Sequence, residues 1–424
     1  MTAHRLPYGH GFLDVDLTTA AAAGHDVETV APCVVAPAAD PLAEVASALA
    51  GAALPPYRGG GCAIAINDTT RPIPHDILLP PLLDRLERAG VAREDIRLIV
   101  ATGTHAPVPG HRFSDIVPRA ILDRYRVTSH DAHADARLAS LGETSRGTPI
   151  LINRDYLEAA IRVVVGAIEP HQFVGFSGGV KSAAVGLAGY PTIVRNHSMM
   201  THPQAQIGRY DDNPVRQDLE EIGARIGVHL ALNVILGAEK RLIRALAGPP
   251  LAVMQQGMPL VRRLNQVEVA RPFDLMIVSP GGHPKDINLY QAQKALAHAA
   301  LVTRPGGTIL LAAACPEGTG SEAYEAWMRQ PGLTSHQAVI QRFTQEGYRI
   351  GPHKAFQISR DASRFRVLLR SDLPVAFVEG LLLTPVADVQ QALADAIARL
   401  APPARIGLMP LANTTIPVLA TTPA

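Results

Sequence analysis

Short apolar runs rich in β-branched residues alternate along the chain with longer stretches that carry leucine at helical spacing. Such runs are typical of strands buried on both faces, and in the first part of the chain they are residues 62–67, 96–102, 163–168 and 228–236. Between the first two lies a helical pattern at residues 77–89, and Gly90 follows it as a stop signal. This strand–helix–strand order predicts an α/β fold with a mainly parallel sheet.

A second set of the same kind begins near residue 270. Pro272 ends any helix that precedes it, so Arg271 and Pro272 make a credible hinge. We therefore expect two α/β domains, 1–270 and 271–424, with mainly parallel sheets and the active site in the crevice between them. The expected strands of the second domain are 275–279, 308–314, 365–369 and 406–409, and its expected helices are 289–302 and 386–400.

The composition of the chain indicates which kinds of binding partner and which cell compartment to expect. The 424 residues leave room for two domains, and 39 basic against 38 acidic residues give no charge excess that would favour nucleic acid or a membrane. Cys33, Cys62 and Cys315 form no CxxC pair, which indicates a reducing compartment and argues against a thiolate metal site. No apolar leader and no apolar run of about 18 residues occurs. We expect a cytoplasmic protein.

Polar segments follow several of the expected strands directly. They occupy residues 67–72, 103–105 and 170–182, and another follows the strand at 275–279. The carboxyl ends of parallel strands border the ligand crevice of such folds. Four polar segments on one side of the sheets are a stronger indication of a site than any one of them.

Residues 175–182, GFSGGVKS, look at first like a Walker phosphate-binding loop. That motif needs glycine directly before the lysine, whereas this chain has Val180, a β-branched residue that disfavours a positive φ. No clear Walker-B aspartate ends an apolar strand. Ser177, Gly178 and Gly179 can still cradle one phosphate at a helix start, or they form only a tight turn. A P-loop-like nucleotide-dependent phosphotransferase stays open as an alternative.

Lys181 opens an Ala/Gly-rich helical segment, and His197 follows sixteen residues later. Burial would lower the pKa of a lysine there and make it a nucleophile or a covalent attachment point. Neutral imidazole is a common ligand of transition metals. One histidine is no metal site by itself, however, since protein sites use three or four ligands. A metal here would need donors other than side chains.

His105 and His171 both stand where a strand passes into a loop. Two imidazoles on opposite sides of a substrate suit a racemase, which needs a base for each enantiomer. For either residue alone, a purely structural role is an equal alternative. His130 and His133 lie in a polar stretch that indicates a solvated loop or a supporting role.

Two further sets of residues can bind an anionic ligand. The guanidinium of Arg71 can bind a carboxylate through two hydrogen bonds at a crevice edge. A local ion pair between Arg71 and Asp68 is the ordinary alternative. Gln291 and Lys294 are three residues apart on one helix face and can point at the same ligand. The preceding Tyr290 supports that interpretation over an ordinary solvated surface.

As a set, these motifs resemble the nickel-dependent lactate racemase family, whose members use a nickel–pincer nucleotide. The resemblance spans residues from about 60 to 300, and its motifs are short but specific in order and spacing. They are Asp68-Thr-Thr-Arg-Pro72, Thr102-Gly-Thr-His105, Glu169-Pro-His171, Ser177-Gly-Gly-Val-Lys181, His197 and Tyr290-Gln-Ala-Gln-Lys294.

The resemblance implies a lysine-tethered cofactor. Lys181 matches the residue that forms a thioamide with a pyridinium-3,5-bisthiocarboxylic acid mononucleotide, whose two sulfurs and ring carbon bind Ni(II). His197 matches the fourth nickel ligand, so the metal site would be His197 with Lys181 through its linked cofactor. The first domain would bind the cofactor and the second would contribute a substrate-binding helix. The implied cofactor-binding residues are Asp68, Thr69, Thr70, Arg71, Lys181 and His197, and the implied substrate-binding residues are Arg71, Tyr290, Gln291 and Lys294.

The implied reaction is racemisation or epimerisation of a 2-hydroxy acid. His105 or His171 would take the hydroxyl proton while hydride passes to the cofactor, and the planar 2-oxo acid could take hydride back on either face. This route avoids the highly charged species that removal of an α-proton beside a carboxylate would build. The implied partners are the 2-hydroxy acid and the enzymes that make the cofactor, with no nucleic acid and no membrane. A non-catalytic carrier of the cofactor is an alternative, although it would not need both histidines.

One loop departs from the family pattern. Lactate-specific members carry an aromatic side chain before the Tyr-Gln motif, whereas this chain reads GGHPKD at residues 281–286, and its tryptophan, Trp327, lies elsewhere. His283 and Lys285 could instead meet a second polar group. A larger or more polar 2-hydroxy acid than lactate is therefore the expected substrate.

Overall fold

The computed structural model describes residues 3–71, 73–237 and 240–420, and it forms two compact units. Val34–Leu264 is called the central unit here, and Met1–Cys33 together with Asn265–Ala424 is called the composite unit. The expected boundary at residue 270 lies close to the observed one. The assignment of the first 33 residues to the first domain needs correction, because β3 (Asp26–Thr29) pairs in parallel with β19 (Arg405–Met409).

The central unit is built on a six-stranded sheet of order β13-β12-β9-β4-β5-β6. All neighbours pair in parallel except β12 and β13, so the expectation of a mainly parallel sheet is confirmed. The strands are β4 (Cys62–Asn67), β5 (Ile96–Ala101), β6 (Arg126–Ser129), β9 (Ile161–Ala167), β12 (Leu230–Leu236) and β13 (Leu242–Gly248).

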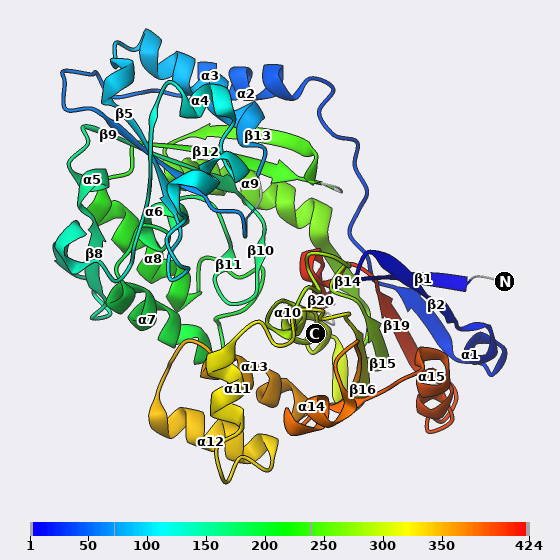
Figure 1. The fold of residues 1–424 in the computed structure, drawn as a ribbon. Helices are drawn as coiled ribbons and strands as arrows, with labels where there is room; N and C mark the ends of the chain where they lie inside the picture. Colours follow the sequence, from blue (N-terminus) through cyan, green and yellow to red (C-terminus); the bar gives the residue numbers. More distant parts are fainter. Residues whose placement is uncertain (1–2, 72, 238–239, 421–424) are drawn as a thin grey trace. The chain divides into compact units, whose positions relative to one another are not determined.

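Helices cover both faces of this sheet (Figure 1). On one face, Val45 and the buried leucines of α3 (His75–Arg88) pack with alternate strand residues such as Ile64 and Val163. α6 and α8 lie on the opposite face (Figure 1). The remaining elements of the unit are α2 (Pro41–Ala50), α4 (Arg119–Leu122), β7 (Leu138–Glu143), β8 (Pro149–Asn153), α5 (Arg154–Leu157), β10 (Pro170–His171), β11 (Gly175–Phe176), α6 (Lys181–Ala184), α7 (Tyr190–Ser198), α8 (Pro214–Ile226) and α9 (Pro250–Asn265).

The composite unit contains a second six-stranded sheet, of order β18-β17-β16-β15-β19-β3, in which every pair is parallel. The apolar runs expected as strands near 275, 308, 365 and 406 are all strands of this sheet. Its remaining strands are β15 (Phe273–Val278), β16 (Thr303–Ala312), β17 (Arg366–Arg370) and β18 (Thr384–Pro385).

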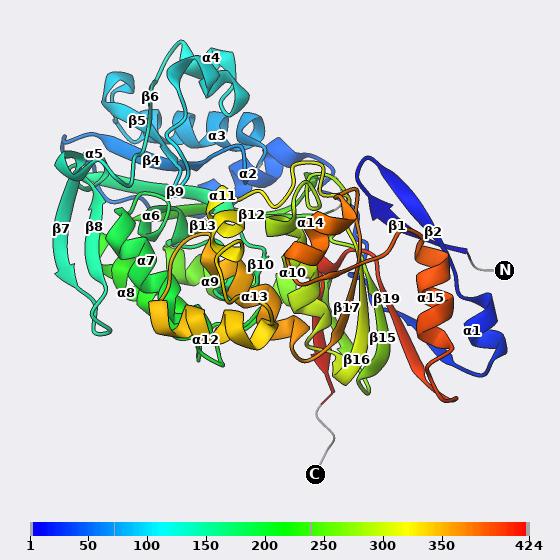
Figure 2. The ribbon, with the colours of Figure 1, turned by 60° about the horizontal axis from the view of Figure 1, so that its bottom comes forward.

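Two clusters of buried side chains hold helices to the two faces of this sheet. Leu275 and Leu310 belong to the cluster that includes α15, and Met276 and Ile309 belong to the one that includes α10; Figure 2 shows these helices on opposite sides of the strands. The other elements are β1 (Ala3–Tyr8), β2 (Gly11–Asp16), α1 (Thr18–Ala22), β14 (Gln266–Val269), α10 (Leu289–Ala299), α11 (Glu322–Met328), α12 (His336–Glu346), α13 (Pro352–Ala362), α14 (Val375–Gly380), α15 (Val389–Ile397) and β20 (Ile416–Leu419).

Within the described residues, no helix is both long enough and apolar enough to cross a lipid bilayer.

Candidate functional site

The loops after β4 and β5 bring a histidine and a carboxylate together. Asp68 follows β4 and His105 follows β5, and these strands are neighbours in the central sheet. The Nδ1 atom of His105 lies 2.7 Å from Oδ2 of Asp68. A carboxylate can only accept, so Nδ1 of His105 carries the proton and its Nε2 carries a lone pair. The His105 side chain is half exposed, so that lone pair can act as a base.

Asp68 is buried, and both of its oxygens are engaged. Its Oδ1 accepts from the backbone N–H of Thr70 at 3.1 Å and from the Thr70 hydroxyl at 2.6 Å. Burial alone would raise the pKa of Asp68, but the hydrogen bonds from His105 and Thr70 and the nearby Arg71 hold that pKa below its ordinary value. The carboxylate is therefore placed to orient His105, and the cofactor contact implied for Asp68 stays a prediction. Thr69 and Arg71 are exposed on the same turn, and Pro72 lies outside the described residues.

The glycine-rich turn is tied into the protein by its own backbone. The N–H of Ser177 donates to the Glu169 carbonyl at 2.8 Å, and the N–H of Gly179 donates to Asn233 Oδ1 at 2.7 Å. Gly175 has a φ of +81°, and a Cβ there would lie 1.6 Å from the Arg209 carbonyl oxygen. Two of the amides that a phosphate loop would aim at its ligand are thus used internally. This finding weakens the phosphotransferase alternative.

Position 180 has a packing role. Val180 is buried and adopts a helical φ of −69° just before α6. A Cβ placed on Gly223 of α8 would lie 2.4–2.7 Å from the Val180 side chain, so the two helices meet there without room for another methyl group. The valine that breaks the Walker pattern is the residue that fixes α6 on α8, and Lys181 follows it directly.

Lys181 and Arg71 both act electrostatically on His197. Burial, together with the positive charges of Lys181 and Arg71, lowers the pKa of His197 to about 3. The imidazole is therefore neutral at ordinary pH, which is the form that binds transition metals. Lys181 and Arg71, both implied for the cofactor, thus lie within electrostatic range of His197.

The Nδ1 atom of His197 has a buried partner that the sequence did not reveal. It lies 3.0 Å from Oδ1 of Asn196, whose Nδ2 donates to Asp218 at 2.8 Å. Asn196 and Asp218 are almost fully buried. A polar residue directly before a candidate ligand was a weak signal in the sequence, and nothing there pointed to Asp218 on α8.

His171 lies in β10, and its ring is the first of three rings in contact, followed by those of Phe173 and His197. Its ring lies 4.8 Å from the Phe173 ring, which in turn lies 5.0 Å from the His197 ring. The N–H of Val174 donates to Nδ1 of His171 at 3.3 Å. A neutral His171 therefore carries its proton on Nε2, the tautomer opposite to that of His105.

His133 agrees with the expectation of a solvated loop, whereas His130 agrees with the alternative, a supporting role. His130 is buried, with Nε2 2.9 Å from the Ala188 carbonyl oxygen and Nδ1 3.2 Å from Asn153 Nδ2. His133 is exposed and lies against the ring of Tyr190. His130 therefore has a structural role in holding adjacent loops.

In the composite unit, the implied substrate residues share the first turns of α10. Asn288 caps this helix by accepting from the N–H of Gln291. Lys294 Nζ donates to Gln291 Oε1 at 2.6 Å, so these two side chains share one face, as their spacing predicts.

Tyr290 is supported by two residues of α13 that the sequence analysis missed. Its hydroxyl lies 3.3 Å from His353 Nε2, and Lys354 Nζ lies 4.1 Å from the centre of its ring. The N–H of Gly351 donates to Nδ1 of His353, so Nε2 of a neutral His353 donates to the tyrosine hydroxyl. Only folding places α13 beside α10, some 60 residues earlier in the chain, so no local motif could indicate this support.

The loop at 281–286 is anchored rather than loose. The Asp286 carboxylate is fully buried and accepts from the N–H groups of Gly9 and Ala314. The exposed ring of His283 stacks on His10 at 4.2 Å. Trp327 is buried in α11 and donates to Glu346, so it belongs to the core of the composite unit.

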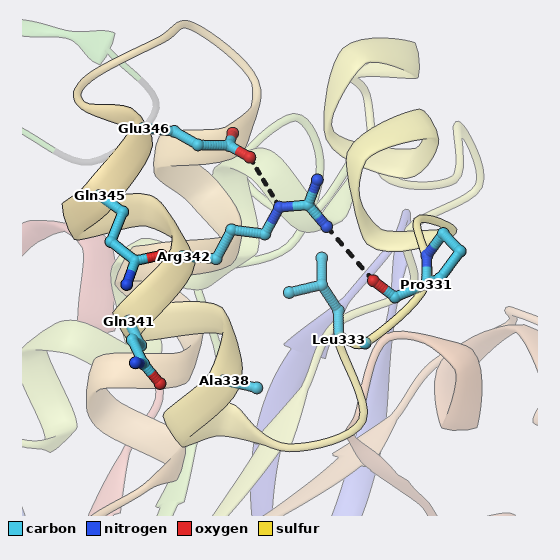
Figure 3. Close-up of a pocket in the computed structure, with 8 residues that line it drawn as sticks. Pro331, Leu333, Ala338, Gln341, Arg342, Gln345 and Glu346 are labelled. Carbon is cyan, nitrogen blue, oxygen red and sulfur yellow. Dashed lines mark hydrogen bonds and ion pairs between the residues drawn. The ribbon is translucent and has the colours of Figure 1, made fainter.

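A hollow of about 380 Å³ lies between α12 and the segment that precedes it (Figure 3). Arg342 crosses it, but its guanidinium already donates to Glu346 and to the Pro331 carbonyl oxygen. Among the described residues, its lining includes none of the predicted site residues. The lining is Pro331, Gly332, Leu333, Ala338, Gln341, Arg342, Gln345 and Glu346.

Comparison with known proteins identifies both parts of the chain. Residues 8–208 match the family described as the lactate racemase N-terminal domain, and residues 268–415 match the lactate racemase C-terminal domain. The chain belongs to the lactate racemase family. It is accordingly an isomerase of the racemase class.

Two lactate racemases illustrate the similarity within the family. The chain is 28% identical to that of Thermoanaerobacterium thermosaccharolyticum over 78% of each chain. It is 34% identical to that of Lactiplantibacillus plantarum, over 62% of each chain.

Solved structures agree with this family assignment. The lactate racemase apoprotein from Thermoanaerobacterium thermosaccharolyticum superposes with a TM-score of 0.89 at 25% identity, covering 98% of this chain and 100% of that one. A Thermotoga maritima protein, 17% identical, shares the fold with a TM-score of 0.67, covering 90% of this chain and 97% of that one.

Proposed function

We propose that this lactate racemase family member interconverts the stereoisomers of a 2-hydroxy acid, with His105 and His171 as the acid–base pair. The observation that carries the proposal is the hydrogen bond between Nδ1 of His105 and Asp68, which leaves a lone pair on Nε2 of His105. His105 presents an unprotonated Nε2 because Asp68 holds its Nδ1–H, whereas a neutral His171 carries its proton on Nε2 because Val174 donates to its Nδ1. His105 is thus prepared to accept a proton at Nε2, and His171 can donate one from Nε2 when its ring is the imidazolium.

The two histidines divide the proton transfers. For one enantiomer, Nε2 of His105 takes the hydroxyl proton of the substrate, and Asp68 stabilises the imidazolium that forms. On the opposite side, Nε2 of His171 in its imidazolium form would give a proton to the oxygen of the planar 2-oxo acid as its carbon regains hydride, and His171 would be left as a neutral imidazole. For the other enantiomer the roles are exchanged, so the reaction is reversible as a racemase requires.

The central unit fits a tethered nickel–pincer nucleotide, which when bound would accept hydride from the substrate α-carbon and return it. Lys181 would hold this cofactor through the thioamide, and His197 would give nickel a neutral imidazole ligand. No three His, Cys, Asp or Glu side chains gather as a metal set within the described residues. A cofactor that brings three of four donors suits a protein that contributes one imidazole.

The chemistry of four side chains suggests how the substrate would be held. Arg71 is exposed beside Asp68 and offers a fork for the substrate carboxylate. Tyr290, Gln291 and Lys294 on α10 would complete the binding of the acid. The polar loop that contains His283 favours a larger or more polar acid than lactate. All three cysteines are free, which supports a reducing compartment such as the cytoplasm.

The test is to produce the protein together with the cofactor-synthesis enzymes and to measure intact mass, nickel content and racemisation of single enantiomers. We expect an added mass on Lys181 and turnover of a 2-hydroxy acid that is larger or more polar than lactate. Lys181→Ala should lose both the adduct and nickel, whereas His197→Ala should keep the adduct and lose nickel. An adduct without any racemisation would indicate a carrier, and full activity of Lys181→Ala would refute the cofactor assignment.

A further inference from the structure

We propose that a buried relay of Thr144, Asp218 and Asn196 fixes the tautomer of His197, so that its Nε2 permanently presents a lone pair. The inference deepens the proposed function, because it concerns the residue to which that function assigns the nickel. It makes Asn196 a positioning residue. The relay runs from the loop after β7, through α8, to α7.

The direction of the relay is set first at Thr144. Its Oγ1 accepts from the backbone N–H of Thr148 at 3.1 Å and from that of Arg146 at 3.3 Å. Backbone N–H groups can only donate, so both lone pairs of this hydroxyl are occupied. The hydroxyl proton must therefore go to Asp218 Oδ1, 2.6 Å away.

Asn196 receives its orientation from two acceptors. Its Nδ2 lies 2.8 Å from Asp218 Oδ2 and 3.1 Å from the Val215 carbonyl oxygen. The backbone carbonyl has no proton to give, so the side-chain NH₂ of Asn196 must face it. The opposite orientation would set two oxygens against each other in a site that excludes water, which is costly.

The last step of the relay reaches the imidazole. With its NH₂ group so fixed, Asn196 turns Oδ1 toward Nδ1 of His197 at 3.0 Å. An amide oxygen only accepts, so Nδ1 of His197 must donate and carries the proton. Nε2 is left with its lone pair, which is the atom state that a metal ligand requires.

As a consequence, a change in the tautomer or the ring orientation of His197 costs free energy. Moving the ring breaks a hydrogen bond to an amide that is 1% exposed. Without such a partner, a neutral histidine is free to place its proton on either nitrogen, and a proton on Nε2 blocks ligation. Outer partners of this kind commonly change metal affinity about 10–100-fold.

The first measurement needs no cofactor. Nitrogen-15 NMR of the cofactor-free protein distinguishes protonated from unprotonated imidazole nitrogens, and a His197→Ala spectrum assigns the signals. We expect one tautomer for His197, with Nδ1 protonated. A proton on Nε2 in the unaltered protein would overturn the inference, whatever the variants do.

The second measurement uses a matched pair of buried substitutions on α7. Asn196→Leu removes the acceptor with little change in size, and Thr192→Val removes a buried hydroxyl one turn earlier that donates to and accepts from Leu151. We expect Asn196→Leu to shift His197 toward Nε2 protonation and Thr192→Val to leave it unchanged. An unaltered tautomer in Asn196→Leu would overturn the role of Asn196.

A nickel readout separates this inference from the proposed function. In protein made with the cofactor-synthesis enzymes, Asn196→Leu should keep the Lys181 adduct but release nickel to a chelator about 10–100-fold more readily. If His197→Ala retained nickel fully while the tautomer followed Asn196 as expected, the ligand assignment would fail and the relay would stand.

Discussion

Three histidines of the central unit differ in chemistry because of the single group that faces each Nδ1 atom. A carboxylate faces His105, a backbone N–H faces His171, and an amide oxygen faces His197. The first and third must therefore donate from Nδ1, whereas the second must accept there. When neutral, His105 and His197 thus carry a lone pair on Nε2 and His171 carries a proton there, and the difference depends on the neighbour rather than on the histidine.

The first prediction concerns Asp68. In Asp68→Asn, Thr70 still donates to the remaining oxygen, so the new NH₂ group faces His105 and forces its proton onto Nε2. Racemisation should fall by about 10²–10⁴-fold in both directions, because the base is lost. Chiral chromatography of each enantiomer measures this loss. The exposed Asp115→Asn serves as control, and an unimpaired Asp68→Asn enzyme would remove Asp68 from the mechanism.

The second prediction concerns His105 and His171, the proposed acid–base pair. His105→Ala and His171→Ala should each lower racemisation in both directions by about 10²–10⁴-fold, since the reaction equilibrium fixes the ratio of forward to reverse efficiency. Rapid mixing with one enantiomer should separate them: one variant should still change the cofactor absorbance and the other should not. The pattern should invert for the opposite enantiomer. Normal absorbance changes in both variants with both enantiomers would show that neither histidine is the base.

At the scale of elements, the strands were the most predictable features and the contacts between helices were the least. The run CAIAIN is β4 at the expected residues, because its alternate side chains are buried on both faces of the sheet. The loops at the strand ends were therefore predictable, and with them Asp68, His105 and His171. Asn196, Asp218 and His353 were not, since their partners come from other elements and leave no periodic pattern.

The third prediction tests the contact between α6 and α8. Alanine in place of a helical glycine normally stabilises a protein by about 0.5–1 kcal/mol, but in Gly223→Ala the new methyl group meets Val180. We expect the free energy of unfolding to fall by about 1–3 kcal/mol and the yield of the Lys181 adduct to fall with it. Denaturant titration and intact mass measure the two effects.

The control for this prediction is Gly380→Ala. A Cβ on Gly380 meets no atom within 4 Å, so that variant should be neutral or slightly more stable. A Gly223→Ala protein as stable as the Gly380→Ala protein would mean that Val180 can move aside freely.

For the molecule as a whole, the sequence predicted two α/β domains but misassigned its first 33 residues. β3 completes the composite sheet by pairing with β19, some 380 residues later. A four-residue edge strand carries too little pattern to show its partner, so position along the chain was a poor guide to the domain. The expected crevice between the domains stays a prediction.

The fourth prediction concerns acid stability, because each unit contains a buried neutral histidine. Burial lowers the pKa of His75 in the central unit and of His298 in the composite unit to about 4. Each Nδ1 faces a backbone carbonyl oxygen, at 3.0 Å and 2.5 Å respectively, and each Nε2 is buried without a partner in the structure. Protonation of either ring in the folded protein would therefore bury an uncompensated charge.

The direction in which the free energy of unfolding changes with pH depends on whether the folded or the unfolded protein takes up the proton. Below pH 6.5 the unfolded chain protonates these histidines, while the folded protein resists until about pH 4. Stability should thus be lost as the pH falls through that window, by about 3 kcal/mol for each histidine.

His75→Asn keeps a donor near the Ile116 carbonyl oxygen but cannot titrate, so its free energy of unfolding should depend less on pH, even if it is lower at pH 7.5. Denaturant titrations between pH 7.5 and 4.5 measure this slope, and His298→Asn gives the same test for the composite unit. Slopes as steep as that of the unaltered protein in both variants would mean that these rings take up protons without unfolding.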